Sequence, residues 1–61
     1  MNIPKDPYIL LSFINTKLRD DYPSLEDLCK SLDINQIELE SKLSSIDFSY
    51  AREVNQFTAA N

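Results

Sequence analysis

Apolar residues recur at helical spacing in three stretches of the chain. Spacings of three, four and seven residues place apolar side chains on one face of a helix and leave the opposite face polar. The pattern predicts three short amphipathic helices, over residues 7–20, 25–32 and about 36–45. Their inward positions are Leu10, Leu11, Ile14 and Leu18 in the first stretch, Leu25, Leu28, Cys29 and Leu32 in the second, and Leu39, Leu43 and Ile46 in the third.

Each predicted helix begins directly after a residue that can cap it. Asp6 precedes Pro7, which is tolerated in a first helical turn, and Ser24 and Asn35 precede the other two helices. The side-chain oxygens of such residues accept the backbone N–H groups that a first turn leaves without partners. The cap positions therefore fix where the three helices start.

After Ile46 the hydrophobic period changes from helical spacing to strict alternation. Ile46, Phe48 and Tyr50 alternate with polar residues, which is typical of a strand. A turn over residues 51–54 and a return strand over residues 56–58 would complete a hairpin, and Asn55 tolerates the left-handed backbone that such turns need. The alternative is a continued third helix, because Ala-Arg-Glu at 51–53 favours helix. We expect the hairpin.

These elements predict a mainly α fold. Three helices with a short connection between the second and third form a helix-turn-helix-like bundle, and a C-terminal β-hairpin makes it resemble a miniature winged helix. We expect one small domain over residues 1–58, followed by a frayed tail over residues 59–61.

The amino-acid composition excludes several kinds of binding and catalytic site. The 61 residues include no His, no Gly and one Cys. Gly-rich phosphate loops, His-based triads and Cys/His zinc sites are therefore excluded. The spacing of Cys29 predicts a buried structural thiol. We expect no catalytic residue, no metal site, no cofactor and no small-molecule substrate, and so no enzyme. No apolar run reaches the roughly 20 residues that span a bilayer, so we expect no membrane partner and a soluble protein from a reducing compartment.

Charge argues against nucleic acid as a partner. The chain carries a formal net charge of −4, and the third predicted helix contains Glu38 and Glu40. Proteins bind duplex DNA chiefly through Lys and Arg, which release the counterions of the phosphates. A helix-turn-helix regulator that binds DNA is kept as the alternative. It requires dimerisation that aligns the cations Lys17, Arg19, Lys42 and Arg52.

The leading hypothesis is a small protein–protein interaction or adaptor domain. Ile37 lies about 200° from Leu39 on a helical wheel and should face outward. Tyrosines are favoured at interfaces because they combine a large apolar area with a polar tip. We therefore name Tyr8, Tyr22, Ile37 and Tyr50 as possible partner-binding residues. The partner is a protein of unknown identity, and a homodimer is one form that the interaction can take.

Asn15 lies in the middle of the first predicted helix, where Asn is a poor helix former. Two interpretations are open. The side chain is exposed and neutral, or it hydrogen-bonds to a backbone group of the C-terminal segment and fixes how the hairpin docks.

Short motifs along nearly the whole chain form a recognisable pattern. They are Pro4-Lys5-Asp6-Pro7-Tyr8, Leu10-Leu11-Ser12, Asn15, Lys17-Leu18-Arg19-Asp20, Ser24-Leu25, Leu28-Cys29, Leu39-Glu40, Lys42-Leu43, Tyr50 and Asn55-Gln56-Phe57. In these motifs the sequence resembles a family of short bacterial proteins known as domain of unknown function 4250. The resemblance implies a bacterial, cytoplasmic protein and no known activity, ligand or catalytic residue. Family members often carry Gly where Asp33 and Asp47 stand here, and Asp is the less favourable residue if the backbone is left-handed there.

Overall fold

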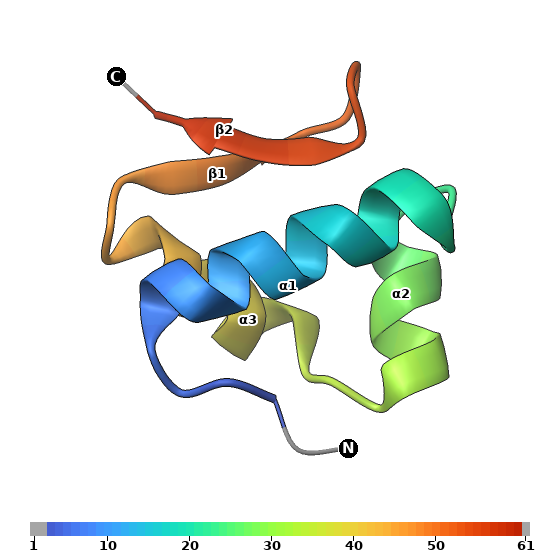
Figure 1. The fold of residues 1–61 in the computed structure, drawn as a ribbon, viewed down its shortest axis with the longest axis horizontal. Helices are drawn as coiled ribbons and strands as arrows, with labels where there is room; N and C mark the ends of the chain where they lie inside the picture. The colour runs from blue at the N-terminus through green and yellow to red at the C-terminus, as the bar shows by residue number, and fades with distance from the viewer. Residues whose placement is uncertain (1–2, 61) are drawn as a thin grey trace.

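Three helices are followed by a two-stranded antiparallel hairpin in the computed structural model, which describes residues 3–60. Figure 1 shows α1 crossing the molecule, with the hairpin on one side of it and α2 and α3 on the other. The predicted mainly α fold with a C-terminal hairpin is confirmed. The elements are α1 (Pro7–Asp20), α2 (Leu25–Leu32), α3 (Gln36–Ser44), β1 (Phe48–Ala51) and β2 (Gln56–Ala59).

The helices begin where the capping residues place them. An Asp6 carboxylate oxygen accepts the N–H groups of residues 8 and 9, at 2.8 and 3.2 Å. The Ser24 hydroxyl accepts the N–H of Asp27 at 3.1 Å, and the Asn35 side chain accepts the N–H of Glu38 at 3.0 Å. These bonds satisfy N–H groups that would otherwise lack partners, so all three helix starts follow from local sequence.

In the described part of the chain, three residues adopt left-handed backbone conformations. They are Asp33 (φ 55°), Asp47 (φ 63°) and Asn55 (φ 52°). Asp33 ends α2 and donates its backbone N–H to the Cys29 carbonyl. Asp and Asn enter this region more readily than other residues with a Cβ atom, because their short side chains can hydrogen-bond locally. The left-handed backbone expected at Asn55 is confirmed. The backbone is left-handed at Asp33 and Asp47 as well, so Asp stands at two positions where Gly would be more favourable.

The hairpin differs from its prediction at three places. The backbone N–H of Ile46 bonds to the Leu43 carbonyl at 3.2 Å, so turns prolong the end of α3 and β1 begins only at Phe48. The turn occupies residues 52–55. The frayed tail expected from residue 59 is wrong for Ala59, which pairs with Phe48, and for Ala60, whose N–H bonds to the Asp47 carbonyl at 2.7 Å. Asn61 lies outside the described residues.

One apolar core joins the three helices to the hairpin. Each helix contributes two or three buried side chains to it, and β2 contributes Phe57, whose ring packs at a tilt against Tyr50 with centroids 5.6 Å apart. The three-residue connection between α2 and α3 gives the helix-turn-helix arrangement. The buried residues are Leu10, Ile14, Leu18, Leu25, Leu28, Cys29, Leu39, Leu43 and Phe57.

Candidate functional site

The polar side chains that cross between elements converge where the hairpin meets α1. Asn15, in the middle of α1, donates its amide N–H to the Phe57 carbonyl at 3.0 Å and accepts the Phe57 backbone N–H at 2.7 Å. Its side chain therefore pairs with the edge of β2 as a neighbouring strand would. Of the two interpretations of Asn15, the hydrogen bond to the C-terminal segment is confirmed.

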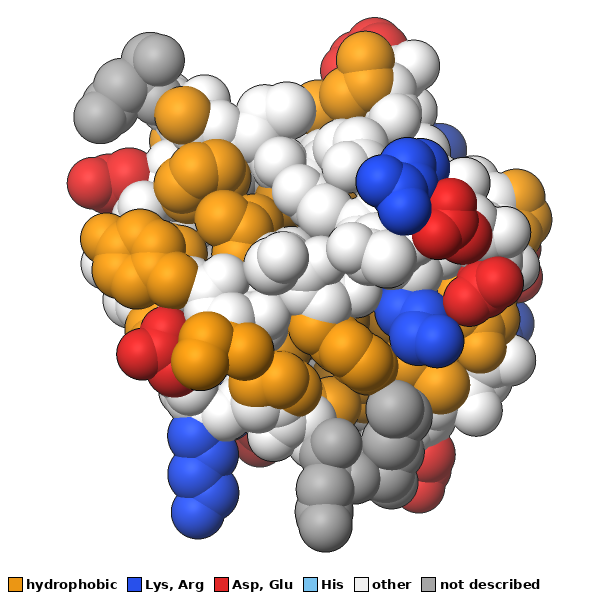
Figure 2. All heavy atoms as spheres, viewed as in Figure 1, with side chains coloured by type: hydrophobic (Ala, Val, Ile, Leu, Met, Phe, Trp, Pro, Cys, Tyr) orange, Lys and Arg blue, Asp and Glu red, His pale blue; other side chains and the backbone are white. Residues whose placement is uncertain are grey.

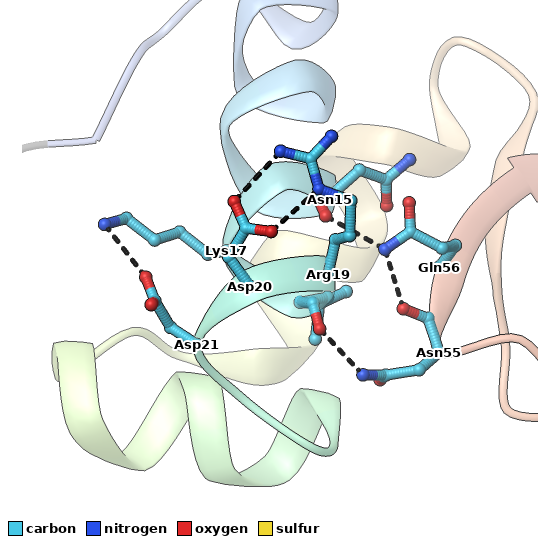
Figure 3. A network of polar contacts seen from close by, with 8 residues as sticks. Asn15, Lys17, Arg19, Asp20, Asp21, Asn55 and Gln56 are labelled. Carbon is cyan, nitrogen blue, oxygen red and sulfur yellow. Dashed lines mark hydrogen bonds and ion pairs between the residues drawn. The ribbon is translucent and has the colours of Figure 1, made fainter.

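Gln56, on the hairpin, binds the backbone of α1 in return. Its side-chain amide donates to the Asn15 backbone carbonyl at 2.9 Å and to the Asn55 carbonyl at 2.9 Å. Figure 3 shows the two side chains lying side by side between α1 and the hairpin. Each element thus uses a side-chain amide to bind the backbone of the other, which fixes both the position and the register of β2 against α1.

Asn55 links the hairpin turn to the junction between α1 and α2. Its amide nitrogen donates to the Leu18 carbonyl at 3.0 Å and to the Tyr22 carbonyl at 2.9 Å (Figure 3 shows the bond to the helix end). Leu18 lies in the last turn of α1, where helix carbonyls lack partners within the helix. Asn55 therefore acts as a cap supplied by a distant part of the chain.

The Tyr50 hydroxyl extends this network to α2. It accepts the backbone N–H of Leu25, the first residue of α2, at 3.3 Å and donates to the Asn55 side-chain oxygen at 2.5 Å. The donor and the acceptor in the bonds of Tyr50 and Asn55 follow from their chemistry, because an N–H and an amide NH₂ can only donate. Together Asn15, Tyr50, Asn55, Gln56 and the Phe57 backbone form what we call the hairpin lock.

The structure separates the four predicted partner-binding residues. Tyr8 and Ile37 are exposed, at 65% and 79%, whereas Tyr22 and Tyr50 are half-buried and pack against the core. The Tyr50 hydroxyl belongs to the hairpin lock, and the lock also binds the Tyr22 carbonyl. Tyr22 and Tyr50 therefore come together around Asn55. Their partner-binding role, like that of Tyr8 and Ile37, stays a prediction.

Two shallow grooves flank these residues. The first, of about 330 Å³, runs between α1 and β2, is lined by Tyr8 among others, and has the Asn15–Gln56 contact in its wall. The second, of about 290 Å³, lies between the start of α2, α3 and the hairpin. Both lie near or below the lower limit of roughly 300–1,000 Å³ that is usual for small-molecule pockets. The second groove is lined by Ser24, Leu25, Glu26, Gln36, Glu40, Tyr50 and Arg52.

The last turn of α1 carries two exposed ion pairs. Lys17 lies 3.4 Å from Asp21, and Arg19 lies 2.8 Å from Asp20. The hydrogen bond from Arg19 holds the pKa of Asp20 below its ordinary value of 3.8. In Figure 2, Lys and Arg side chains stand directly beside acidic ones at the right of the face shown. Two of the four cations that DNA binding would need are therefore already paired with aspartates.

Cys29 is 6% exposed within the core. Burial raises the pKa of its thiol, and the negative charge of Glu40 raises it further. A thiolate is the nucleophilic form of Cys, and it forms where positive charge lowers the pKa. The predicted buried thiol is confirmed, and its surroundings oppose ionisation.

A comparison with protein-family models matches residues 4–57 to "Domain of unknown function (DUF4250)". The chain belongs to the DUF4250 family. A search of curated proteins found no significant match. A search of solved structures also found no significant match. Within residues 3–60 of this DUF4250 domain, no helix is long and apolar enough to cross a membrane.

The fold accounts for several residues of the family resemblance. Asn15, Tyr50 and the run Asn55-Gln56-Phe57 contact one another in the hairpin lock. Sequence reasoning pointed to the role of Asn15 but missed those of Tyr50 and Gln56. The only sequence signal for Tyr50 and Gln56 was that both belong to the residues on which the family resemblance rests. In this DUF4250 domain that pattern therefore describes how the hairpin is attached to α1.

Proposed function

We propose that this DUF4250 domain is a small non-enzymatic protein-interaction module whose partner contacts the outward face of α3. The observation that carries this proposal is the position of Ile37. It is 79% exposed and lies in the first turn of α3, the helix that a helix-turn-helix protein presents to DNA. Large apolar side chains are typical of the centre of a protein interface, whereas DNA-reading helices offer cations and polar groups.

The charge of α3 supports a protein partner over DNA. Glu38 and Glu40 lie in the first half of the helix beside Ile37, and the only cation of α3, Lys42, lies in its last turn. A duplex approaching this face would meet carboxylates before it met any lysine. The DNA-binding alternative keeps only cations that are scattered over α1, α3 and the hairpin turn.

The absence of enzymatic activity is part of this proposal. The polar side chains that converge within residues 3–60 bind backbone groups in the hairpin lock, which leaves their donors and acceptors occupied. The one thiol is buried, and its pKa is raised. A free buried cysteine also supports the cytoplasmic location that we propose, since thiols persist in reducing compartments.

The test is capture of proteins from a lysate of the source cells on three immobilised chains. These are the wild type, Ile37→Asp and Val54→Asp, the last being a matched control at another exposed apolar residue (60%), in the hairpin turn. Both changes alter stability by less than about 0.5 kcal/mol, because the side chains are exposed. We expect a protein that the wild type and V54D retain to be absent from the I37D eluate.

Two results would overturn the proposal. One is the same set of proteins on the wild type and I37D. The other is binding of duplex DNA to the wild type that strengthens as salt is lowered, which would establish the regulator hypothesis instead.

A further inference from the structure

The net negative charge of the chain comes from one part of the fold. Residues 24–47, which contain α2 and α3, hold six carboxylates and two lysines, a formal net charge of −4 that equals that of the whole chain. The remainder of the sequence, with α1 and the hairpin, has four cations and four carboxylates and is neutral. The face that carries Ile37 therefore belongs to the charged part.

The carboxylates of this charged part lack cationic partners of their own. Within residues 3–60, both ion pairs lie at the end of α1, and no Lys or Arg pairs with a carboxylate of α2 or α3. Unpaired carboxylates on a surface with an exposed isoleucine are complementary to a partner that presents both positive charge and an apolar side chain.

A groove places two of these carboxylates beside the Ile37 face. Glu26, from the first turn of α2, and Glu40, from α3, line the same 290 Å³ groove, together with Gln36, the neighbour of Ile37. The Tyr50 side chain forms part of its wall, and the hairpin lock holds that ring in place. Of the described residues that line the groove, Arg52 is the only cation, and it forms no ion pair with them.

We propose that this groove and Ile37 together bind a basic segment of a partner protein. A Lys or Arg side chain of the segment enters the groove between Glu26 and Glu40, and an adjacent apolar side chain covers Ile37. This assignment rests on the proposed function, because it names the chemistry of the partner at the same face.

A second copy of this chain does not fit the same site. Two such faces would bring together two copies of residues 24–47, each with a net charge of −4, and like charges across an interface are unfavourable. The partner is therefore a different protein, and its contacting segment carries the opposite charge.

The test begins with a phage-displayed library of random 12-residue peptides selected on the immobilised 61-residue chain. Peptides that are recovered are synthesised, and their affinities are measured by fluorescence anisotropy. We expect Lys and Arg to be enriched and at least one apolar residue to be retained. The double variant E26Q/E40Q should weaken binding about five-fold, as expected for two exposed ion pairs.

Two further variants sharpen the assignment. R52Q removes the groove's only cation and should strengthen binding about two-fold, an effect opposite in sign to that of the glutamate changes. The control E53Q/D21N also removes two negative charges, but outside the groove, and should leave affinity within two-fold of the wild type. Melting curves of all variants confirm that the fold is intact.

The outcomes separate this inference from the function on which it rests. Peptides without excess basic residues that still lose affinity in I37D would overturn the groove assignment and leave the interaction function in place. An equal loss in E53Q/D21N and E26Q/E40Q would overturn it as well, by showing unspecific attraction. Peptides that bind I37D as tightly as the wild type would overturn the proposed function itself.

Discussion

The two parts of this fold are held together by different forces. Among residues 3–60, six hydrogen bonds between side chain and backbone connect residues far apart in sequence, and all of them involve the hairpin lock. Helix α3 takes part in none of the six and is held by its cap and by Leu39 and Leu43 in the core. Directional bonds thus fix α1 and the hairpin, whereas apolar packing holds α3.

This difference separates the residues that make the fold from those that are free to make contacts. A hydrogen-bonded side chain such as Asn55 cannot be exchanged without leaving its partners unsatisfied. Within residues 3–60, the outward side chains of α3, with Ile37 among them, take no part in the hydrogen bonds of the hairpin lock. The predictions below test the contrast, from the largest expected effect to the smallest.

Leu43→Ala should cause the largest loss, because packing is what holds α3. Leu43 is completely buried, and truncating such a leucine costs about 2–5 kcal/mol. A domain of this size has only about 3–5 kcal/mol of net stability. We therefore expect a largely unfolded chain at 25 °C, measured by circular dichroism and urea titration. A cooperative melt close to that of the wild type would show that α3 has another anchor.

Asn55→Asp tests the directional bonds without straining the backbone, since Asp also tolerates left-handed backbone. The change replaces an amide that donates to the carbonyls of Leu18 and Tyr22 with a carboxylate that repels them. We expect a loss of about 2–4 kcal/mol from two lost donors and a misplaced charge.

Asp47→Asn is the matched control for this change. It makes the reverse exchange at another left-handed residue, one that is exposed. It should change the free energy of unfolding by less than about 0.5 kcal/mol. Similar effects in the two variants would place the cost in the backbone and not in the hydrogen bonds.

Asn15→Ala removes both bonds to the backbone of Phe57 and leaves that N–H without a partner. We expect a loss of about 1–3 kcal/mol and faster amide hydrogen exchange at Phe57. The amides of Ser49 and Thr58, which lie opposite each other in the hairpin, should keep more of their protection. Uniform acceleration across the hairpin would mean that it detaches as one body.

Asp33→Gly should give the smallest effect, and one of opposite sign. The backbone at residue 33 is left-handed, a conformation that Gly adopts without a steric penalty. We expect a gain of about 0.5 kcal/mol, which raises the melting temperature by about 2–4 °C in a domain of this size. Asp27→Gly, inside α2, should lower the melting temperature. A gain in both variants would contradict the backbone explanation.

Local signals made most of the fold predictable from the sequence. Asp6, Ser24 and Asn35 marked the helix starts, and the alternation from Ile46 marked the hairpin, because caps and periodicity act over a few residues. The strand ends were less predictable. Ala59 and Ala60 are held by backbone pairing, which leaves no trace in their side chains.

The hairpin lock was only partly predictable for a related reason. Its bonds between the hairpin and the helices join residues 25 to 42 positions apart, and no spacing rule applies to such pairs. An Asn in mid-helix was an anomaly that indicated a distant partner, whereas Tyr50 and Gln56 suit a strand without further explanation. Only the assembled fold shows which backbone groups they bind.

The pairing of Asn15 with Phe57 also sets the earliest moment at which α1 can be secured in a growing chain. Forty-two positions separate the two residues, and a ribosome adds roughly 5–20 residues per second. For the roughly 2–8 s between their additions, a nascent α1 has no β2 backbone to which Asn15 can bind. Secure attachment of the first helix therefore waits until translation has passed the last strand.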